Sequence, residues 1–429
     1  MRHAPWFPTS GVVDLTGIPC PDASRLERMT HENSLVATVA VGLAFALLGG
    51  FAAVRLRMPA VVGYLLAGIA VGPFTPGFVA DVTLAPQLAE IGIVLLMFGV
   101  GMHFSLRSLL GVRGVALPGA MAQIFVATIL GIALARSWDW SFGAGLVFGL
   151  ALSVASTVVL LRALEARQSL TSSDGQIAVG WLIVEDLAMV IALVLLPALA
   201  GPLAGQPIAH SPGSASPSLW ATLGLTIGKV VLFIGLMLLV GTRLFPWLLT
   251  QVERMRSREL FTLAVVTLAL GVAFGSAELF GVSLALGAFF AGVVVNQSDF
   301  SHRAAADLQP LQDAFSVLFF VAVGMLFDPG ILLRQPLQVL AVLAVILLGK
   351  SAAAFLIVRA LRHPVATALT VSAALAQIGE FSFILAGLGV ALGVLPSEGY
   401  NLILAGALLS ITLNPLVFRI LAPQETQGV

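Results

Sequence analysis

The sequence predicts an all-α polytopic membrane protein with thirteen transmembrane helices in two inverted six-helix repeats. Three observations predict this fold: an apolar composition, long uncharged runs, and two motifs that recur at one offset. Hydrophobic residues make up 59% of the chain and charged residues 10%, whereas soluble domains contain about 25% charged residues. The formal net charge is zero, so nothing in the charge balance indicates nucleic acid binding.

Apolar runs of about 20 residues, long enough to cross ~30 Å of hydrocarbon as helices, follow one another from Leu35 onward. Two of them, 59–73 and 280–296, are too short to span comfortably. The expected spans are 35–54, 59–73, 87–104, 115–135, 141–162, 176–200, 220–245, 258–276, 280–296, 312–328, 336–358, 366–393 and 399–421.

Two motifs recur in the two halves of the chain. Residues 63–71 (GYLLAGIAV) resemble 287–295 (GAFFAGVVV), and residues 94–102 (VLLMFGVGM) resemble 317–325 (VLFFVAVGM), at offsets of 224 and 223. Six spans form each repeat, and the seventh span lies between the two repeats. Six crossings return the chain to the side on which it began, and the seventh moves it to the other side, so the second repeat is inverted relative to the first. Inverted repeats are a recurring architecture of secondary transporters. The expected segments are an N-terminal tail (1–34), the first repeat (35–200), a polar linker (201–219), a linking span (220–245), the second repeat (258–421) and a C-terminal tail (422–429).

The distribution of arginines predicts the orientation. With the N-terminus outside, most arginines fall in cytoplasmic loops, and the outer loops beyond the N-terminal tail contain Arg136 and Arg334. Cytoplasmic loops are enriched in Lys and Arg. We therefore expect a multi-pass membrane protein with its N-terminus outside and its C-terminus in the cytoplasm.

Two adjacent carboxylates, Glu185 and Asp186, lie near the middle of the run 176–200. A carboxylate at this depth costs roughly 2.5–3.5 kcal/mol on insertion scales, and its default explanation is an ion or proton pathway. Lys350 is similarly deep in the eleventh span and needs a partner, for which Asp186 or Glu185 is the natural candidate. Neighbouring helical residues point about 100° apart, so we expect one carboxylate to line the site and the other to face a neighbouring helix or a second aqueous face.

Polar interruptions occur in the fifth span at residues 153–157 and in the twelfth at 377–382. At the offset of 223, Thr157 matches Glu380, so the interruptions occupy equivalent places in the two halves. Such paired breaks are the best pointer to a transport site, because unwound segments free carbonyl groups and helix ends. The candidate ion- and proton-binding residues are Asp186, Glu185, Lys350, Ser156, Thr157, Gln377 and Glu380, of which Asp186 and Thr157 are the candidate ligands of a monovalent cation.

Motifs of enzymes and cofactor sites do not occur in the sequence. It contains no Walker motif, no Ser/His/Asp arrangement, no metal-binding histidine spacing and a single cysteine, Cys20. The glycines at 63, 68, 287 and 292 are expected to permit close helix contacts. We therefore expect a protein that is not an enzyme and binds no cofactor.

Six motifs together resemble the Kef-type (YbaL-like) potassium/proton antiporters of the monovalent cation:proton antiporter-2 family. They are residues 62–68 (VGYLLAG), 95–105 (LLMFGVGMHFS), 156–162 (STVVLLR), 180–186 (GWLIVED), 287–292 (GAFFAG) and 377–383 (QIGEFSF). The resemblance covers about residues 29–421. It implies crossed discontinuous helices in a mobile core, a scaffold that forms a homodimer, and Asp186 as the carboxylate that binds cation and proton, with Lys350 as its basic partner.

The resemblance also implies a function. It predicts exchange of a monovalent cation, potassium or sodium, for protons by alternating access, with both competing for Asp186. Members of this family usually continue into a cytoplasmic nucleotide-binding regulatory domain, whereas this sequence stops at Val429, before such a domain. The alternatives are a sodium-coupled symporter of organic anions with the same fold, or a ligand-gated cation efflux channel.

Overall fold

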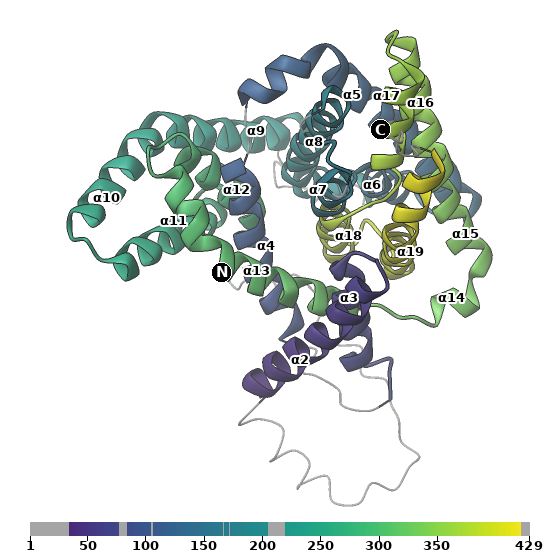
Figure 1. Ribbon diagram of the computed structural model, residues 1–429, viewed down its shortest axis with the longest axis horizontal. Coiled ribbons are helices and arrows are strands. Elements are labelled where there is room, and N and C mark those ends of the chain that lie inside the picture. Colours follow the sequence, from purple (N-terminus) through teal and green to yellow (C-terminus); the bar gives the residue numbers. More distant parts are fainter. Residues whose placement is uncertain are drawn as a thin grey trace, which may run out of the picture. The chain divides into compact units, whose positions relative to one another are not determined.

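The described part of the protein is entirely helical in the computed structural model (Figure 1). The expected tails lie outside the described residues apart from Ser34, and the polar linker 201–219 is described only at its ends. The described residues are 34–76, 84–103, 106–165, 167–170, 172–204 and 219–421.

Short loops and two π-helical turns, η1 and η2, connect or interrupt the helices. The helices are α2 (Ser34–Arg55), α3 (Ala60–Val71), α4 (Ala85–His103), α5 (Leu106–Ser137), α6 (Phe142–Ser153), α7 (Thr157–Glu165), α8 (Ser173–Leu203), α9 (Leu219–Leu236), η1 (Met237–Gly241), α10 (Thr242–Arg254), α11 (Arg258–Phe280), α12 (Leu284–Asn296), α13 (Ser301–Met325), α14 (Ile331–Arg334), α15 (Pro336–Ala344), η2 (Val345–Lys350), α16 (Ser351–Ala360), α17 (Val365–Ala374), α18 (Glu380–Ala391) and α19 (Ser397–Leu421).

Ten helical stretches of the described part are long and apolar enough to cross a membrane. Four shorter apolar helices, α3, α12, α17 and α18, accompany them. The expected second and ninth spans coincide with α3 and α12, and the expected twelfth span is divided into α17 and α18. The chain is thus a helical polytopic membrane protein, and thirteen crossings stay a prediction.

The first of two compact units comprises residues 1–92 and 314–329. In it α2 packs against α3, and a Cβ atom on Gly63 would lie only 2.2 Å from the carbonyl carbon of Gly49. Close backbone contact of this kind is typical of helices that pack in a membrane. An apolar cluster joins α2 and α3 to the adjoining parts of α4 and α13; its buried members are Ala46, Ala67, Val71, Ala85, Val321, Ala322 and Met325.

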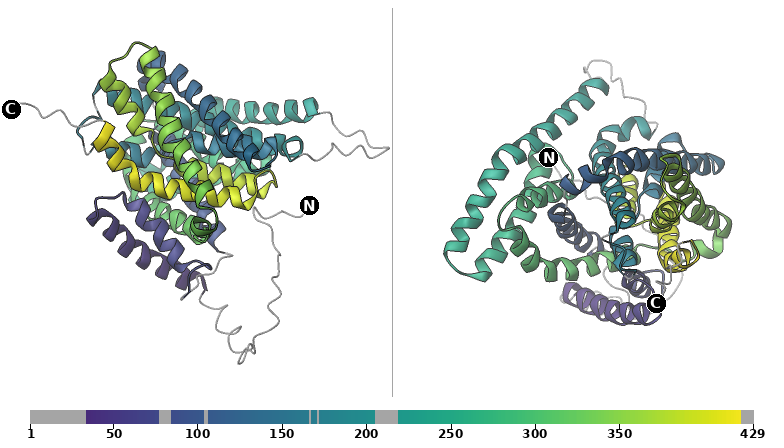
Figure 2. Two further views of the ribbon diagram at one scale, coloured as in Figure 1. Left: turned by 90° about the vertical axis from the view of Figure 1, so that its right-hand side faces the viewer. Right: turned by 45° about the horizontal axis from the view of Figure 1, so that its top comes forward.

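The second unit comprises residues 93–313 and 330–429. Within it α5 packs against α6 and α8, while α18 packs against α6, α8 and α19. Figures 1 and 2 show these helices, from the middle and the end of the chain, gathered in one bundle. Its core includes the fully buried Trp181, Leu160 and Val371, and this bundle holds the candidate site residues.

The recurring motifs make reciprocal contacts. A Cβ atom on Gly68 would lie 2.8 Å from the Cα of Gly324, and a Cβ atom on Gly292 would lie 3.0 Å from the Cα of Gly101. Gly68 and Gly292 are equivalent positions in the copies of the first motif, as Gly101 and Gly324 are in the copies of the second. Each first-motif helix therefore packs on the second-motif helix of the other half, and the sequence predicts such close contacts for Gly68 and Gly292.

Candidate functional site

The first interrupted helix ends at Ser153 (α6) and resumes at Thr157 (α7). Val154, which follows α6, has an extended conformation with φ −103° and ψ 131°. The break leaves main-chain groups without helical partners in a buried environment, where each must find another partner. It lies beside α8, which carries both predicted carboxylates.

Both carboxylates of α8 bind the first break. Glu185 is fully buried, and its Oε2 accepts a hydrogen bond of 2.8 Å from the main-chain N–H of Ala155. Asp186 Oδ2 accepts a hydrogen bond of 3.1 Å from the Thr157 hydroxyl. Ala155 and Thr157 are two residues apart, so side chains that diverge from α8 meet the same segment. Which of the two carboxylates lines an ion site stays a prediction.

The second break separates α17, which ends at Ala374, from α18, which begins at Glu380. Gln377, in this break, clamps the first one: its Oε1 accepts a 2.8 Å hydrogen bond from Ser156 N–H, and its Nε2 donates a 3.1 Å hydrogen bond to the Ser156 carbonyl. The Ser156 hydroxyl donates a 2.9 Å hydrogen bond to Glu380 Oε2. One residue of the first break thus binds two residues of the second.

Gly379 allows the two breaks to touch. Its backbone is extended, with φ −142° and ψ −152°, which any residue can adopt. A Cβ atom at this position would lie 2.3 Å from Ser156 Cβ and 2.4 Å from Ser156 Cα. A larger residue would force apart the segments that Gln377 joins.

Lys350 is fully buried at the end of the π-helical turn η2. Its Nζ donates a 3.1 Å hydrogen bond to the main-chain carbonyl of Gln377, so its direct contact is with the second break. Lys350 and Glu185 are close enough for their charges to interact. π-Helical turns inside α-helices occur frequently at functional sites, and this one sets the position of the ammonium group.

The charges of the site do not balance by themselves. Asp186 is close enough to Glu185 and Glu380 for like charges to interact. Three ionised carboxylates with one ammonium group would leave two buried negative charges, which is costly unless protons or cations neutralise them. Glu185 Oε1 and Asp186 Oδ1 are buried and have no hydrogen-bond partner among the described residues. The site can therefore bind positive charge.

The seven predicted residues gather at this pair of breaks. Gln377 uses its amide on Ser156 main-chain groups, so it acts as a clamp between the segments. Lys350 binds a carbonyl, and its electrostatic partner is Glu185, one of the two carboxylates expected for it, whereas the family resemblance implies Asp186. Gln123 of α5, which is fully buried, is not among the predicted residues; its lone amide in an apolar span was the available signal.

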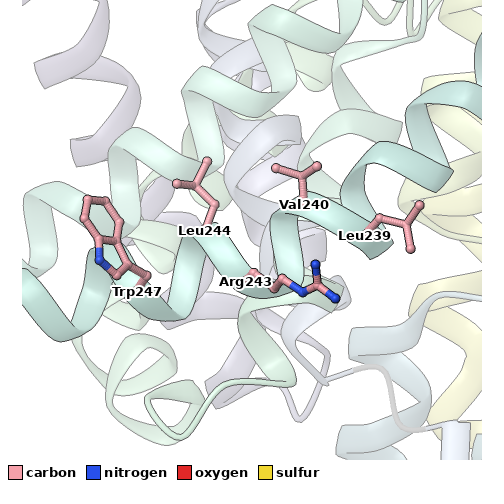
Figure 3. Close-up of a pocket in the computed structure, with 5 residues that line it drawn as sticks. All are labelled: Leu239, Val240, Arg243, Leu244 and Trp247. Atoms are coloured by element: carbon pink, nitrogen blue, oxygen red, sulfur yellow. The ribbon is translucent and has the colours of Figure 1, made fainter.

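A groove of about 550 Å³ lies elsewhere in the second unit, on η1 and α10 (Figure 3). None of the carboxylates lines it. It is lined by Leu239, Val240, Arg243, Leu244 and Trp247. In the described ranges no group of three or more His, Cys, Asp or Glu side chains is arranged to hold a metal ion. Because the groove has no carboxylate in its lining, the carboxylate pair at the first break is the stronger candidate for a cation-binding site.

Comparison with known proteins places this site in context. A family model described as sodium/hydrogen exchanger, transmembrane, matches residues 42–423. The Escherichia coli (strain K12) protein described as "Putative cation/proton antiporter YbaL" is 61% identical over 393 residues, which cover 92% of this chain and 69% of that protein. The Arabidopsis thaliana protein K(+) efflux antiporter 4 is 32% identical over 92% of this chain and 65% of its own length.

A solved structure shares the fold. The sodium proton antiporter MjNhaP1 from Methanocaldococcus jannaschii, in a structure at pH 8, matches with a TM-score of 0.68 over 90% of this chain and 98% of that chain. The sequence identity is 16%, so this likeness concerns the arrangement of helices.

Proposed function

The chain belongs to the sodium/hydrogen exchanger family, and from this premise we propose that it exchanges a monovalent cation for protons across a bacterial inner membrane. The resemblance to YbaL-type cation/proton antiporters read from the motifs is confirmed by the 61% identity. The transported ions, the shared site and the mechanism are the proposal.

One observation carries the proposal: beside a broken helix, one carboxylate oxygen of Asp186 accepts a hydrogen bond and the other accepts none from the described residues. Thr157 binds Oδ2, while Oδ1 has no hydrogen-bond partner among the described residues. A dehydrated cation needs such oxygen ligands, and the Thr157 hydroxyl offers another. A proton can occupy the same carboxylate, so the two ions compete for Asp186 and each displaces the other.

Competition becomes transport when the loaded site alternates between the two sides. We assign alternating access to motion of the bundle around the two breaks, with the ion site near mid-membrane. Two inverted repeats would relate the halves, and the exchanged glycine contacts of Gly68 with Gly324 and of Gly292 with Gly101 support this symmetry. The N-terminus lies outside, the C-terminus lies in the cytoplasm, and the protein forms a homodimer.

Potassium is the cation that we propose first. The reason is the name of a relative, K(+) efflux antiporter 4, which is 32% identical to this chain. Sodium is second, because the solved structure that shares the fold is that of a sodium proton antiporter. Lithium, a smaller monovalent cation, is the third cation of the test.

The test is proton flux in proteoliposomes that contain the purified chain, titrated separately with potassium, sodium and lithium. The proposal expects an outward cation gradient to drive proton entry, with saturation and with the lowest KM for potassium. Cation flux without proton movement would favour a channel. Cation uptake that depends on an added organic anion would favour a symporter. Either result would contradict the proposal.

A further inference from the structure

Gln123 lies in the middle of α5, fully buried and outside the set of carboxylates and their direct ligands. Its Nε2 donates a 3.0 Å hydrogen bond to the carbonyl of Ser153, the last residue of α6. Its Oε1 accepts a long hydrogen bond of 3.5 Å from the indole N–H of Trp181 on α8. One side chain therefore joins the end of the interrupted helix to the helix that carries Glu185 and Asp186.

The two partners need one donor and one acceptor at this place. The Ser153 carbonyl only accepts hydrogen bonds, and the Trp181 indole N–H only donates one. Among neutral side chains of this length, glutamine offers one donor and one acceptor on neighbouring atoms, and the two contacts fix its orientation. Loss of the side chain would leave a buried carbonyl without this donor, which is costly.

Trp181 links Gln123 to the helix that carries Glu185 and Asp186. It is fully buried and lies one helical turn before Glu185, with whose carboxylate it also interacts. Gly119, one turn before Gln123, faces the indole so closely that a Cβ atom would lie 2.2 Å from Trp181 Cζ3. The indole is therefore held by α5 at two consecutive turns.

The second break has a corresponding contact. Lys350, from the helix that precedes the broken pair α17 and α18, donates to the carbonyl of Gln377. In both halves a side chain of the preceding helix binds a main-chain carbonyl at the break. The donor is a neutral amide at the first break and an ammonium group at the second.

We propose that Gln123 is a positioning residue for ion exchange, which fixes the end of α6 and, through Trp181, the position of Glu185 relative to Ala155. The proposal rests on the proposed function, because its effect is on cation binding at the first break. Gln123 does not touch the ions.

The test compares Gln123→Met, Gln123→Glu and a control, Thr128→Val, in potassium/proton exchange measured over a range of pH. Thr128 lies on the same helix and is buried, and its hydroxyl has no hydrogen-bond partner among the described residues. Loss of one buried hydrogen bond corresponds to about a fivefold to tenfold change in an equilibrium constant. Gln123→Met is therefore expected to raise the KM for potassium about fivefold to tenfold with kcat changed less than twofold, and Thr128→Val to leave both within twofold.

Gln123→Glu supplies a readout that packing alone would not move. A protonated glutamic acid can donate to Ser153 and accept from Trp181 as glutamine does, whereas a carboxylate has no donor. The ratio of its KM to that of the wild type should fall as the pH is lowered. A ratio that stays well above one at low pH, where the carboxyl is protonated and can donate, would overturn the role of Gln123, and this measurement stands even where Gln123→Met fails to fold.

The outcomes separate this inference from its premise. Normal wild-type exchange with a Gln123→Met variant that matches Thr128→Val would overturn the role of Gln123 alone. A wild-type protein that moves no protons in response to any of the three cations would contradict the proposed function and this role together.

Discussion

At the scale of single residues, the site is defined by what the two adjacent carboxylates bind. Glu185 is held by the main-chain N–H of Ala155, whereas Asp186 is held by the Thr157 hydroxyl. A hydroxyl can turn and offer its lone pairs to a cation, which an amide N–H cannot do. This difference favours Asp186 as the ion-binding carboxylate and Glu185 as a structural partner of the break and of Lys350.

The Thr157 hydroxyl provides the first residue-scale prediction. Thr157→Val keeps the shape of the side chain and removes the hydrogen bond to Asp186. A hydrogen bond to a charged group contributes roughly 1.5–3 kcal/mol, so we expect the KM for the cation to rise tenfold or more. The control is Thr412→Val, whose hydroxyl binds the Leu408 carbonyl within α19; equal KM values for the two variants would argue against the contact.

Lys350 provides the second prediction at the scale of single residues. Lys350→Met removes the ammonium group that balances part of the buried negative charge, so protons are held more tightly by the remaining carboxyl groups. We expect the pH profile of exchange to move to higher pH, while cation binding is retained at alkaline pH. The profile is measured in proteoliposomes from pH 6 to 10, and a profile that coincides with that of the wild type would remove Lys350 from the mechanism.

At the scale of elements, hydrogen bonds from a side chain of the second break to the main chain of the first join the two broken helices. Gln377 of the second break binds both the N–H and the carbonyl of Ser156 in the first. Its amide oxygen replaces the helical partner that the Ser156 N–H lacks, and its amide N–H shares the Ser156 carbonyl with the N–H of Leu160. A segment that is unwound in the membrane interior is tolerated only where such partners exist, so the breaks stabilise one another.

Close approach at Gly379 gives the element-scale prediction. Gly379→Ala would place its Cβ atom against Ser156 Cβ and Cα, and such overpacking typically costs about 1–3 kcal/mol. We expect a lower melting temperature and loss of most of the exchange activity. The matched control is Gly387→Ala in α18, the helix that follows Gly379, where the nearest atom, from Tyr400, is 4.0 Å from the added Cβ.

The control and the variant must differ in both measurements. Gly387→Ala should leave activity unchanged, and its melting temperature should be equal to or above that of the wild type, since alanine favours a helix over glycine. A Gly379→Ala protein with wild-type activity would show that the two breaks need not touch.

Sequence patterns predicted the breaks but not how they are joined. Clusters of hydroxyls at 153–157 and of Gln, Gly and Glu at 377–380 mark interrupted helices, because such residues are expensive in an apolar span. The partner of each polar group depends on packing between segments more than 200 residues apart in the sequence. Helical periodicity gives no information about such packing. The binding of Glu185 and Asp186 to one segment was not predicted for the same reason. The angle between two side chains on a helix does not show the path of the segment that packs against them.

At the scale of the whole molecule, the family and the helical membrane fold could be predicted from composition, spans and motifs. The family match over residues 42–423 confirms the former, and the likeness to a sodium proton antiporter structure at a TM-score of 0.68 confirms the latter. The thirteen crossings and the inverted symmetry stay predictions, since α3, α12, α17 and α18 are too short for length alone to settle their path.

The central claim for the whole molecule is that proton and cation compete for Asp186. Its most direct test is the release of protons when potassium is added to the purified protein in weakly buffered solution, followed with a pH indicator. The wild type and the control Glu278→Gln, an exposed carboxyl of α11, should release protons in proportion to the cation bound. Asp186→Asn should remain folded and release none; proton release by Asp186→Asn equal to that of the wild type would contradict the claim.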